Sequence, residues 1–267
     1  RSVYNDESGN LWVGTRGGGL NKLPPESGIR KAYTMENGLS NNAVLSLNMD
    51  HNNNLWIGVD GEGVDMLEPS SGKIFHFPRD LKNEEVLEFG NVYSICVDIY
   101  GSIWLGTNGY GLVNMEVARD KDGAYVLRKF RQFRYKGGEQ GLNSDIVYSI
   151  LEEGPNILWI GTRGGGLNRL NTLNSSFEIF GVREQAEKKF VDDDILSLCL
   201  SSDQKLWIGT SKGLSVLNLS YKPYQFVHYT ERNGLPNNTV HGLLEDAAGQ
   251  IWISTNQGLS KLDVSTG

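Results

Sequence analysis

The chain has 267 residues and a formal net charge of −7, because 32 Asp and Glu residues outweigh 25 Lys and Arg residues. This balance argues against a general nucleic-acid binder, since affinity for phosphate rests on Lys and Arg. No run of 18 apolar residues occurs, so no membrane span is expected within this sequence. Hydrophobic residues make up 39% of the chain, enough for a sizeable core, and its 33 glycines recur at fixed offsets, as turns do.

One short motif recurs six times, and each copy holds one of the six tryptophans. In chain order the copies are LWVGT (Leu11 to Thr15), LWIGV (Leu55 to Val59), IWLGT (Ile103 to Thr107), LWIGT (Leu158 to Thr162), LWIGT (Leu206 to Thr210) and IWIST (Ile251 to Thr255). The intervals between Trp12, Trp56, Trp104, Trp159, Trp207 and Trp252 are therefore 44, 48, 55, 48 and 45 residues. A period in this range indicates one supersecondary unit repeated along the chain.

The second copy shows what one unit contains. Four short runs rich in Val, Ile, Leu and Phe lie within residues 42–50, 55–59, 64–67 and 74–77, and each is bounded by Gly, Asn, Asp or Ser, which is typical of strands. The connections of about four to six residues fall in the hairpin range. Each repeat is therefore predicted to be an antiparallel meander of four strands, named a to d.

Several such meanders arranged radially make a β-propeller, which limits exposed sheet edges. The predicted fold class is all-β, a propeller of four-stranded antiparallel blades, with one partial propeller domain over residues 1–267. The predicted repeats are centred on the six tryptophans.

Strand b predicts how the blades pack. The pleat sends Leu55 and Ile57 to one face and Trp56 and Gly58 to the other. Both faces are apolar, so we expect blades packed face to face, with Trp filling the space between them and contributing about 2–3 kcal/mol each. Gly58 leaves room for a ring or a neighbouring blade. Tryptophans that stack on carbohydrate are the alternative, but the placement in mid-strand favours a core.

Two features have plain structural interpretations. The glycine loops at residues 15–20 and 162–167 lead into another strand, whereas a phosphate-binding loop leads into a helix. They are predicted to be tight b–c turns in which Gly supplies positive φ. Cys96 and Cys199 stand at equivalent positions two repeats apart, too far for a disulfide, and are expected to be buried free thiols.

The full repeat resembles that of a known family. Each Trp motif follows an acidic or hydroxyl residue, and three copies also follow a Gly-Leu-x-x-(Asn/Asp)-x-Val element at residues 38–44, 141–147 and 234–240. The residue six positions before Trp is Asp6, Asp50, Asp98, Glu153, Ser201 or Asp246. This pattern, which covers the whole chain, resembles the two-component regulator propeller repeat.

The resemblance implies a role in sensing. That family forms the periplasmic sensor region of hybrid histidine kinases in Bacteroidetes, and many members respond to glycan fragments and control polysaccharide-utilisation genes. It implies a non-enzymatic module with an oligosaccharide ligand, a homodimer in the full protein, and contact with the membrane only through the parent protein. Neither a cofactor nor a metal is expected.

Some segments depart from the pattern. Ser254 replaces the usual Gly, the fifth and sixth b–c turns are shorter, and the third repeat has a long excursion from Glu116 to Asp145. Insertions occupy residues 78–91 and 181–194, and the second is predicted to form a short helix. The basic and aromatic residues at 128–136 could suit nucleic acid or an anionic glycan, but a charge-protected outer strand d is favoured.

The ends of the chain also fit the repeat. Ser2 aligns with Ser46 in the middle of strand a, and residues 265–267 align with the turn before strand d. The expectation is a fragment of a seven-bladed or tandem propeller, holding six blades less one strand. Such a fragment would have an incomplete ring or an exposed edge strand, with a tendency to pair between chains.

Loops that differ from blade to blade predict where a ligand binds. In a propeller the b–c turns and d–a connections emerge on one face, and variable loops on a rigid scaffold are where function concentrates. The candidate ligand-binding residues of the b–c turns are Arg16, Asp60, Asn108, Tyr110, Arg163, Lys212 and Asn256. The d–a connections add Asn41, Asn42, Asn91, Tyr93, Asn143, Asp145, Asn237, Asn238 and His241. The alternative is that these are solvated loop residues, with Asn before strand a capping the turn.

Three functions compete. The first is the ligand-sensing module. The second is a propeller lyase or glycosidase, but no catalytic residue emerges, since the four His lack metal-site spacing and no GxSxG elbow occurs. The third is a structural or dimerisation scaffold whose partner domains bind the ligand.

Overall fold

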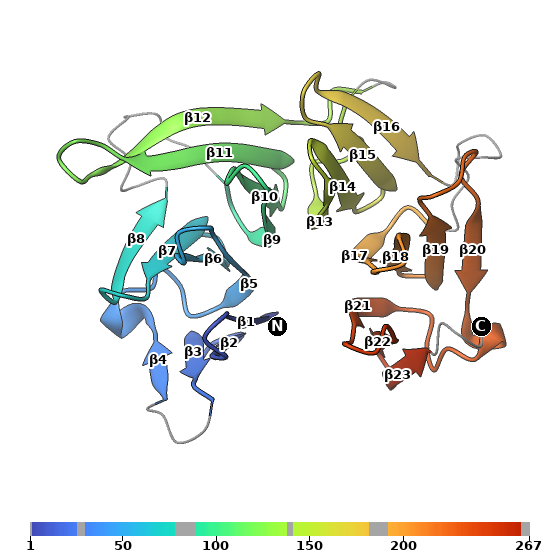
Figure 1. Ribbon diagram of the computed structural model, residues 1–267, viewed down its shortest axis with the longest axis horizontal. Coiled ribbons are helices and arrows are strands. Elements are labelled where there is room, and N and C mark those ends of the chain that lie inside the picture. The colour runs from blue at the N-terminus through green and yellow to red at the C-terminus, as the bar shows by residue number, and fades with distance from the viewer. Residues whose placement is uncertain (1, 26–29, 78–88, 138–140, 182–191, 263–267) are drawn as a thin grey trace. The chain divides into compact units, whose positions relative to one another are not determined.

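The computed structural model describes residues 2–25, 30–77, 89–137, 141–181 and 192–262. It confirms an all-β propeller with six blades built as antiparallel meanders (Figure 1). The blades fall into two compact units, residues 1–133 and 134–267. The helices of the described residues are two short 3-10 turns, η1 (Met35–Asn37) and η2 (Glu231–Asn233), and neither could cross a membrane. The single domain boundary at 1–267 stays a prediction.

The first unit holds three four-stranded blades. Blade 1 comprises β1 (Ser2–Asn5), β2 (Leu11–Gly14), β3 (Leu20–Leu23) and β4 (Lys31–Tyr33). Blade 2 comprises β5 (Val44–Met49), β6 (Leu55–Val59), β7 (Val64–Glu68) and β8 (Lys73–Phe77). Blade 3 comprises β9 (Val92–Val97), β10 (Ile103–Thr107), β11 (Leu112–Arg119) and β12 (Tyr125–Phe133).

The second unit repeats this arrangement. Blade 4 comprises β13 (Val147–Gly154), β14 (Ile157–Thr162), β15 (Leu167–Asn171) and β16 (Ser176–Phe180). Blade 5 comprises β17 (Ile195–Leu200), β18 (Lys205–Thr210), β19 (Leu214–Asn218) and β20 (Phe226–Tyr229). Blade 6 has three described strands, β21 (Val240–Glu245), β22 (Ile251–Thr255) and β23 (Gly258–Leu262). Within each unit the a strands of neighbouring blades lie side by side.

The predicted face-to-face packing is confirmed between neighbouring blades. Trp12 of blade 1 packs in one cluster with Leu55 and Ile57 of blade 2. Trp56, on the other face of the same strand, packs with Leu105 of blade 3. Trp159 packs in the same way with Leu206 and Ile208 of blade 5, and Trp207 with Ile251 and Ile253 of blade 6. The two faces of strand b therefore serve two different interfaces.

Two tryptophans differ from this pattern. Trp104 is buried and stacks on Phe133 of its own blade, with ring centroids 6.0 Å apart. Trp252 is only half-buried, and its ring lies under the Lys261 ammonium at 5.1 Å. Trp252 is therefore less buried than the other five tryptophans, which are at most 3% exposed.

The residue six positions before each Trp has a role that the sequence did not reveal. In all six blades its side-chain oxygen accepts the indole N–H, at 2.8–3.0 Å. Asp246 also accepts backbone N–H groups of Gln250 and Ala248. The Trp252 indole, followed by these amides, lowers the pKa of Asp246 to about 2. The side chain at this position thus closes the a–b turn onto the Trp ring.

A serine and a glycine face each other across strands a and b in every blade. Ser46 pairs with Gly58, and a Cβ on Gly58 would lie 2.2 Å from the Ser46 Oγ and 2.5 Å from the Val92 carbonyl oxygen of blade 3. In blade 6 the pair is inverted, with Gly242 opposite Ser254. The unusual Ser254 is therefore matched by an unusual Gly on the partner strand.

The long excursion of the third repeat is an extended hairpin. Strands β11 and β12 pair from Leu112 and Phe133 outward to Arg119 and Tyr125, with one bulge. This confirms the segment around 128–133 as outer strand d. The two cysteines are free, as expected, although only Cys96 is fully buried. The helix predicted in 181–194 and most of the 78–91 insertion lie outside the described residues, as does the turn at 265–267.

Candidate functional site

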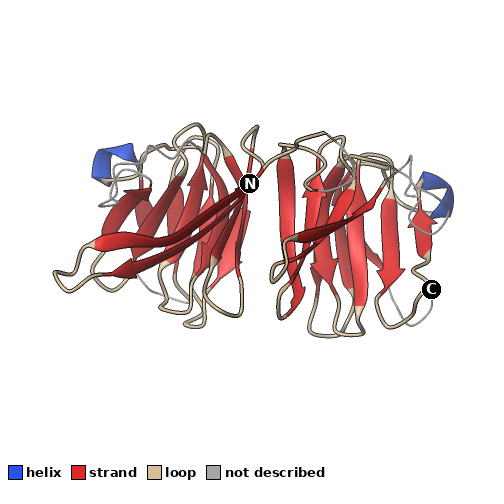
Figure 2. Ribbon diagram, turned by 90° about the horizontal axis from the view of Figure 1, so that it is seen from above, coloured by secondary structure: helices blue, strands red, loops and turns tan. Residues whose placement is uncertain are grey.

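In blades 2 to 5 the b–c turn is tied to the preceding d–a connection by a backbone hydrogen bond. Asp60 N–H donates to the Ala43 carbonyl at 3.1 Å, and Asn108 N–H donates to the Asn91 carbonyl at 3.0 Å. In the second unit, Arg163 N–H donates to the Ile146 carbonyl at 2.9 Å. Within each unit these segments therefore share one end of the sheets (Figure 2), as predicted. This end is called the loop face below.

The first unit presents four predicted site residues on its loop face. Arg16, Asp60 and Asn108 are exposed and Tyr110 is half-buried. The side chains of Arg16 and Asp60 make no hydrogen bond within the described part of the chain. Tyr110 packs beside Gly90, where an added Cβ would lie 3.1 Å from the ring. An exposed guanidinium, carboxylate and amide can all bond to hydroxyl groups or carboxylates of a ligand.

The second unit presents the other three. Arg163 is exposed, and its side chain has no hydrogen-bond partner among the residues described. Lys212 lies 3.2 Å from the buried carboxylate of Asp192, which also accepts the Ser211 hydroxyl. The Asn256 side-chain oxygen lies 2.7 Å from His241 Nε2. The structure therefore brings Asn256 and His241 together and leaves Arg163 available.

The asparagines of the d–a connections are used to build the loops. Asn42 and Asn238 accept the first N–H groups of η1 and η2, at 2.8 Å each. Asn41 and Asn237 each accept the N–H two residues later, and the Asn41 amide also donates to the Asp60 carbonyl at 2.8 Å. The capping alternative is correct for these residues, which weakens them as ligand-binding candidates.

A buried polar group near the loop face was missed by sequence reasoning. Asp65 on β7 is fully buried and accepts both the backbone N–H and the hydroxyl of Ser40, each at 2.8 Å. His76 Nδ1, on β8 opposite Asp65, lies 2.9 Å from the same carboxylate. The equivalent positions of blade 4 are also in contact, since the Asn143 N–H donates to the Asn168 side-chain oxygen at 3.3 Å. A polar residue at this position of strand c is therefore the signal in the repeat that points to the contact.

Ser40, Asp65 and His76 are not arranged as a catalytic triad, so the Ser40 hydroxyl is not activated as a nucleophile. In a catalytic triad the imidazole lies between the hydroxyl and the carboxylate, so that it can accept the hydroxyl proton. Here the carboxylate of Asp65 lies between Ser40 and His76. The arrangement is a structural tie between strands c and d and the d–a connection.

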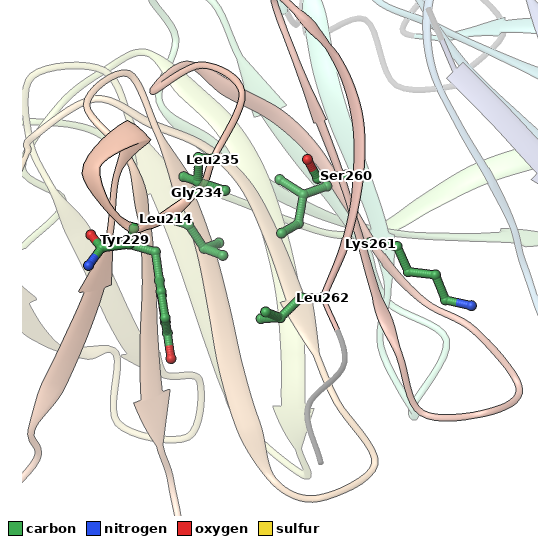
Figure 3. Close-up of a pocket in the computed structure, with 9 residues that line it drawn as sticks. Leu214, Tyr229, Gly234, Leu235, Ser260, Lys261 and Leu262 are labelled. Carbon is green, nitrogen blue, oxygen red and sulfur yellow. The ribbon is translucent and has the colours of Figure 1, made fainter. Parts of the chain in front are cut away.

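A pocket lies beside the outer end of blade 6, between blades 5 and 6. Its volume is about 150 Å³, and its lining comes from β19, β20, η2 and the residues after it, β22 and β23. The lining residues are Leu214, Tyr229, Asn233, Gly234, Leu235, Ile253, Ser260, Lys261 and Leu262. Figure 3 shows Leu214, Leu235 and Leu262 turned toward one space, with Lys261 directed away from it. The lining combines aliphatic side chains with the polar residues Tyr229, Asn233, Ser260 and Lys261.

Comparison with known proteins supports the family resemblance. Residues 38–61, 87–109 and 234–257 match the family described as two component regulator propeller. Three of the six repeats carry this match. The segments cover strands a and b and the end of the connection before them in blades 2, 3 and 6.

Relatives place this repeat in signalling proteins. Over 167 residues the chain is 27% identical to a curated protein named histidine kinase P4 from Formosa agariphila, covering 45% of this chain and 12% of that protein. The extracellular domain of a proposed hybrid two component system of B. thetaiotaomicron is similar over 99% of this chain and 33% of its own, with 27% identity and a TM-score of 0.79. The chain thus spans a minor part of both.

More distant structures share the fold alone. A streptogramin B lyase matches with 13% identity and a TM-score of 0.69, over 98% of this chain and 78% of its own. The non-enzymatic role expected for this chain agrees with its likeness to an extracellular signalling domain at higher identity.

Proposed function

We propose that this chain is a ligand-sensing propeller module in the extracytoplasmic part of a hybrid two-component signalling protein. The observation that carries the proposal is the likeness to an extracellular domain of such a system over 99% of the chain. The match of three repeats to the regulator propeller family supports it independently. A periplasmic location and a homodimer in the full protein form part of the proposal.

The proposed ligand is a glycan fragment that contacts the loop face of one unit, and the proposed output is regulation of polysaccharide-utilisation genes. The exposed side chains of Arg16 and Arg163 support this ligand class, because each can donate several hydrogen bonds to hydroxyl groups or carboxylates. Asp60 and Asn108 add an exposed acceptor and an exposed amide. The rigid sheets beneath hold these groups in fixed positions.

The test is calorimetric titration of the complete ectodomain with a panel of neutral and uronic-acid oligosaccharides. Saturable binding without product is expected, and the variant on the unit that binds, Arg16→Ala for the first or Arg163→Ala for the second, should weaken it about tenfold. Arg128→Ala, on the exposed outer strand β12, is the matched control and should leave affinity unchanged.

Other outcomes would identify the competing functions. Loss of binding in Arg128→Ala alone would move the site to the outer strand. Turnover of any sugar would establish an enzyme. No binding to the ectodomain, combined with loss of signalling when the propeller is deleted, would establish the scaffold role.

A further inference from the structure

Strand a of blades 2 to 6 carries the same irregularity at its loop-face end. In blade 2, Val44 pairs with Val59 and Ser46 with Gly58, so one extra residue, Leu45, lies on strand a between two consecutive pairs. The same one-residue β-bulge occurs in blades 3 to 6, where the extra residues are Tyr93, Tyr148, Leu196 and His241. Bulges of this kind are common next to active sites, because they re-aim a side chain.

The bulge lets one strand face two neighbouring blades. Ile195 packs in the cluster between blades 4 and 5. A Cβ on Gly209 would lie 2.3 Å from the Ser197 Oγ and 2.7 Å from Val240 Cγ1 of blade 6, so Ser197 faces the other way. Residues two apart in an unbroken strand face the same side, so the extra residue between them causes this switch. Within the described part of the chain, Leu196 itself belongs to neither of the core clusters beside blade 5.

The extra residue varies while its neighbours stay nearly constant. It follows Val or Ile in all five blades and precedes Ser in blades 2 to 5 and Gly in blade 6. The extra residue itself is Leu, Tyr, Tyr, Leu or His. The constant neighbours serve the packing between blades. A changing side chain on a rigid scaffold is instead where specificity for a ligand is expected.

Each extra residue has a companion in the b–c turn of its own blade. In blade 6 the two are in contact, since His241 Nε2 lies 2.7 Å from Asn256 Oδ1. Asn256 is the first residue after strand b, and the same position of blade 4 is Arg163. Blade 4 therefore places the phenol ring of Tyr148 and a guanidinium at the two positions that are in contact in blade 6.

The pair in blade 4 has the chemistry for an acidic sugar. An aromatic ring can cover the apolar face of a pyranose, and a guanidinium can hold a carboxylate through two parallel hydrogen bonds. Arg163 is exposed, and its side chain has no hydrogen-bond partner among the described residues. The companions in the other blades with a bulge carry no positive charge; they are Asp60, Asn108, Ser211 and Asn256.

We propose that Tyr148 and Arg163 recognise a uronic acid residue of the glycan, an inference that rests on the proposed function. The C–H face of the pyranose ring lies on the Tyr148 ring, and the sugar carboxylate accepts two hydrogen bonds from Arg163. Strands a of blades 4, 5 and 6 lie side by side. Leu196 and His241 therefore line the path of the adjoining sugar residues. The inference assigns the ligand to the second unit and to the class of acidic glycans.

The test is calorimetric titration of the complete ectodomain with trisaccharides of galacturonate, mannuronate or guluronate and with their methyl esters. At least one acidic trisaccharide should bind, and its ester, which keeps the ring without the charge, should bind about tenfold more weakly. Arg163→Gln should remove this preference for the acid. Tyr148→Leu should weaken acid and ester alike by about tenfold, whereas Tyr148→Phe, which keeps the ring, should bind normally.

The matched control is Tyr93→Leu, the same change at the equivalent bulge of blade 3, which should leave binding unchanged. Leu occupies this position in blades 2 and 5, so neither Leu variant should disturb the fold, and circular dichroism checks this. Equal binding of acid and ester, or equal losses in Tyr93→Leu and Tyr148→Leu, would overturn the inference. Binding of neutral oligosaccharides alone would overturn it and leave the proposed function intact, whereas no binding of any sugar would overturn both.

Discussion

Blades 2 and 6 contain the same repeat but differ in how much of it is buried. Trp56 is 2% exposed and Val64 fully buried, whereas Trp252 is half-buried and Leu259 is 63% exposed. Blade 2 packs against blade 1 on one face and blade 3 on the other and has a fourth strand, while blade 6 has three described strands and packs against blade 5. The motif therefore provides core residues, and the neighbouring strands decide whether they are buried.

The two blades also differ in polar contacts, and the changes occur in matched pairs. In blade 2 Ser40 donates its N–H and hydroxyl to Asp65. In blade 6 Pro236, which has no N–H, stands in place of Ser40, and Ser260 stands in place of Asp65. Blade 6 therefore lacks both the hydrogen-bond donor and the buried carboxylate, so neither group is present without its partner.

The largest expected difference concerns the tryptophans. Trp56→Ala should destabilise the protein by about 3–5 kcal/mol, because it leaves a large cavity between two packed blades. Trp252→Ala should cost less than about half of this, since much of its ring already contacts solvent. Urea unfolding of both variants, followed by circular dichroism, provides the comparison. Equal costs would show that blade 6 is covered as completely as blade 2.

The next difference concerns the buried carboxylate. Asp65→Ala removes the acceptor of the Ser40 N–H and should cost about 2–3 kcal/mol, because buried donors left unpaired are expensive. Ser260→Ala, at the equivalent position of blade 6, should change stability by less than about 0.5 kcal/mol. The same urea titration measures both. A cost for Ser260→Ala as large as that for Asp65→Ala would contradict the pairing argument.

The fold could be predicted from the sequence because it depends on a repeated local pattern. Six Trp motifs with hairpin-length connections specify the meander, and alternation along strand b specifies which side chain meets which blade. The half-burial of Trp252 could not be predicted from the same pattern, because burial depends on what packs against the side chain. The sequence shows that Asp50 and its counterparts lie six residues before each Trp. The hydrogen bond that they accept from the indole is shown only by the structure.

The candidate site was predicted less completely than the fold. The shared end of the b–c turns and d–a connections follows from topology and is confirmed within each unit. Which side chains are available there does not follow, because an exposed Asn has the same sequence signal whether it caps a turn or faces a ligand. Asn41 and Asn42 cap turns, whereas Arg16 and Arg163 remain available. Their role in binding stays a prediction.

The smallest expected difference concerns the inverted Ser–Gly pair of blade 6. It tests whether the glycine is required by the serine opposite it in the same blade or by the backbone of the next blade. Gly242→Ser should cost about 1 kcal/mol, because its Cβ would lie 2.9 Å from the Ser254 Oγ. Adding Ser254→Gly should recover most of that cost, whereas Ser260→Gly, which does not face this position, should not.

In blade 2 the reciprocal exchange, Ser46→Gly with Gly58→Ser, should stay destabilising. The Val92 carbonyl of blade 3 blocks a Cβ at Gly58 whatever stands opposite. Recovery in both blades, measured by double-mutant cycles, would show that the next blade does not select glycine at this position.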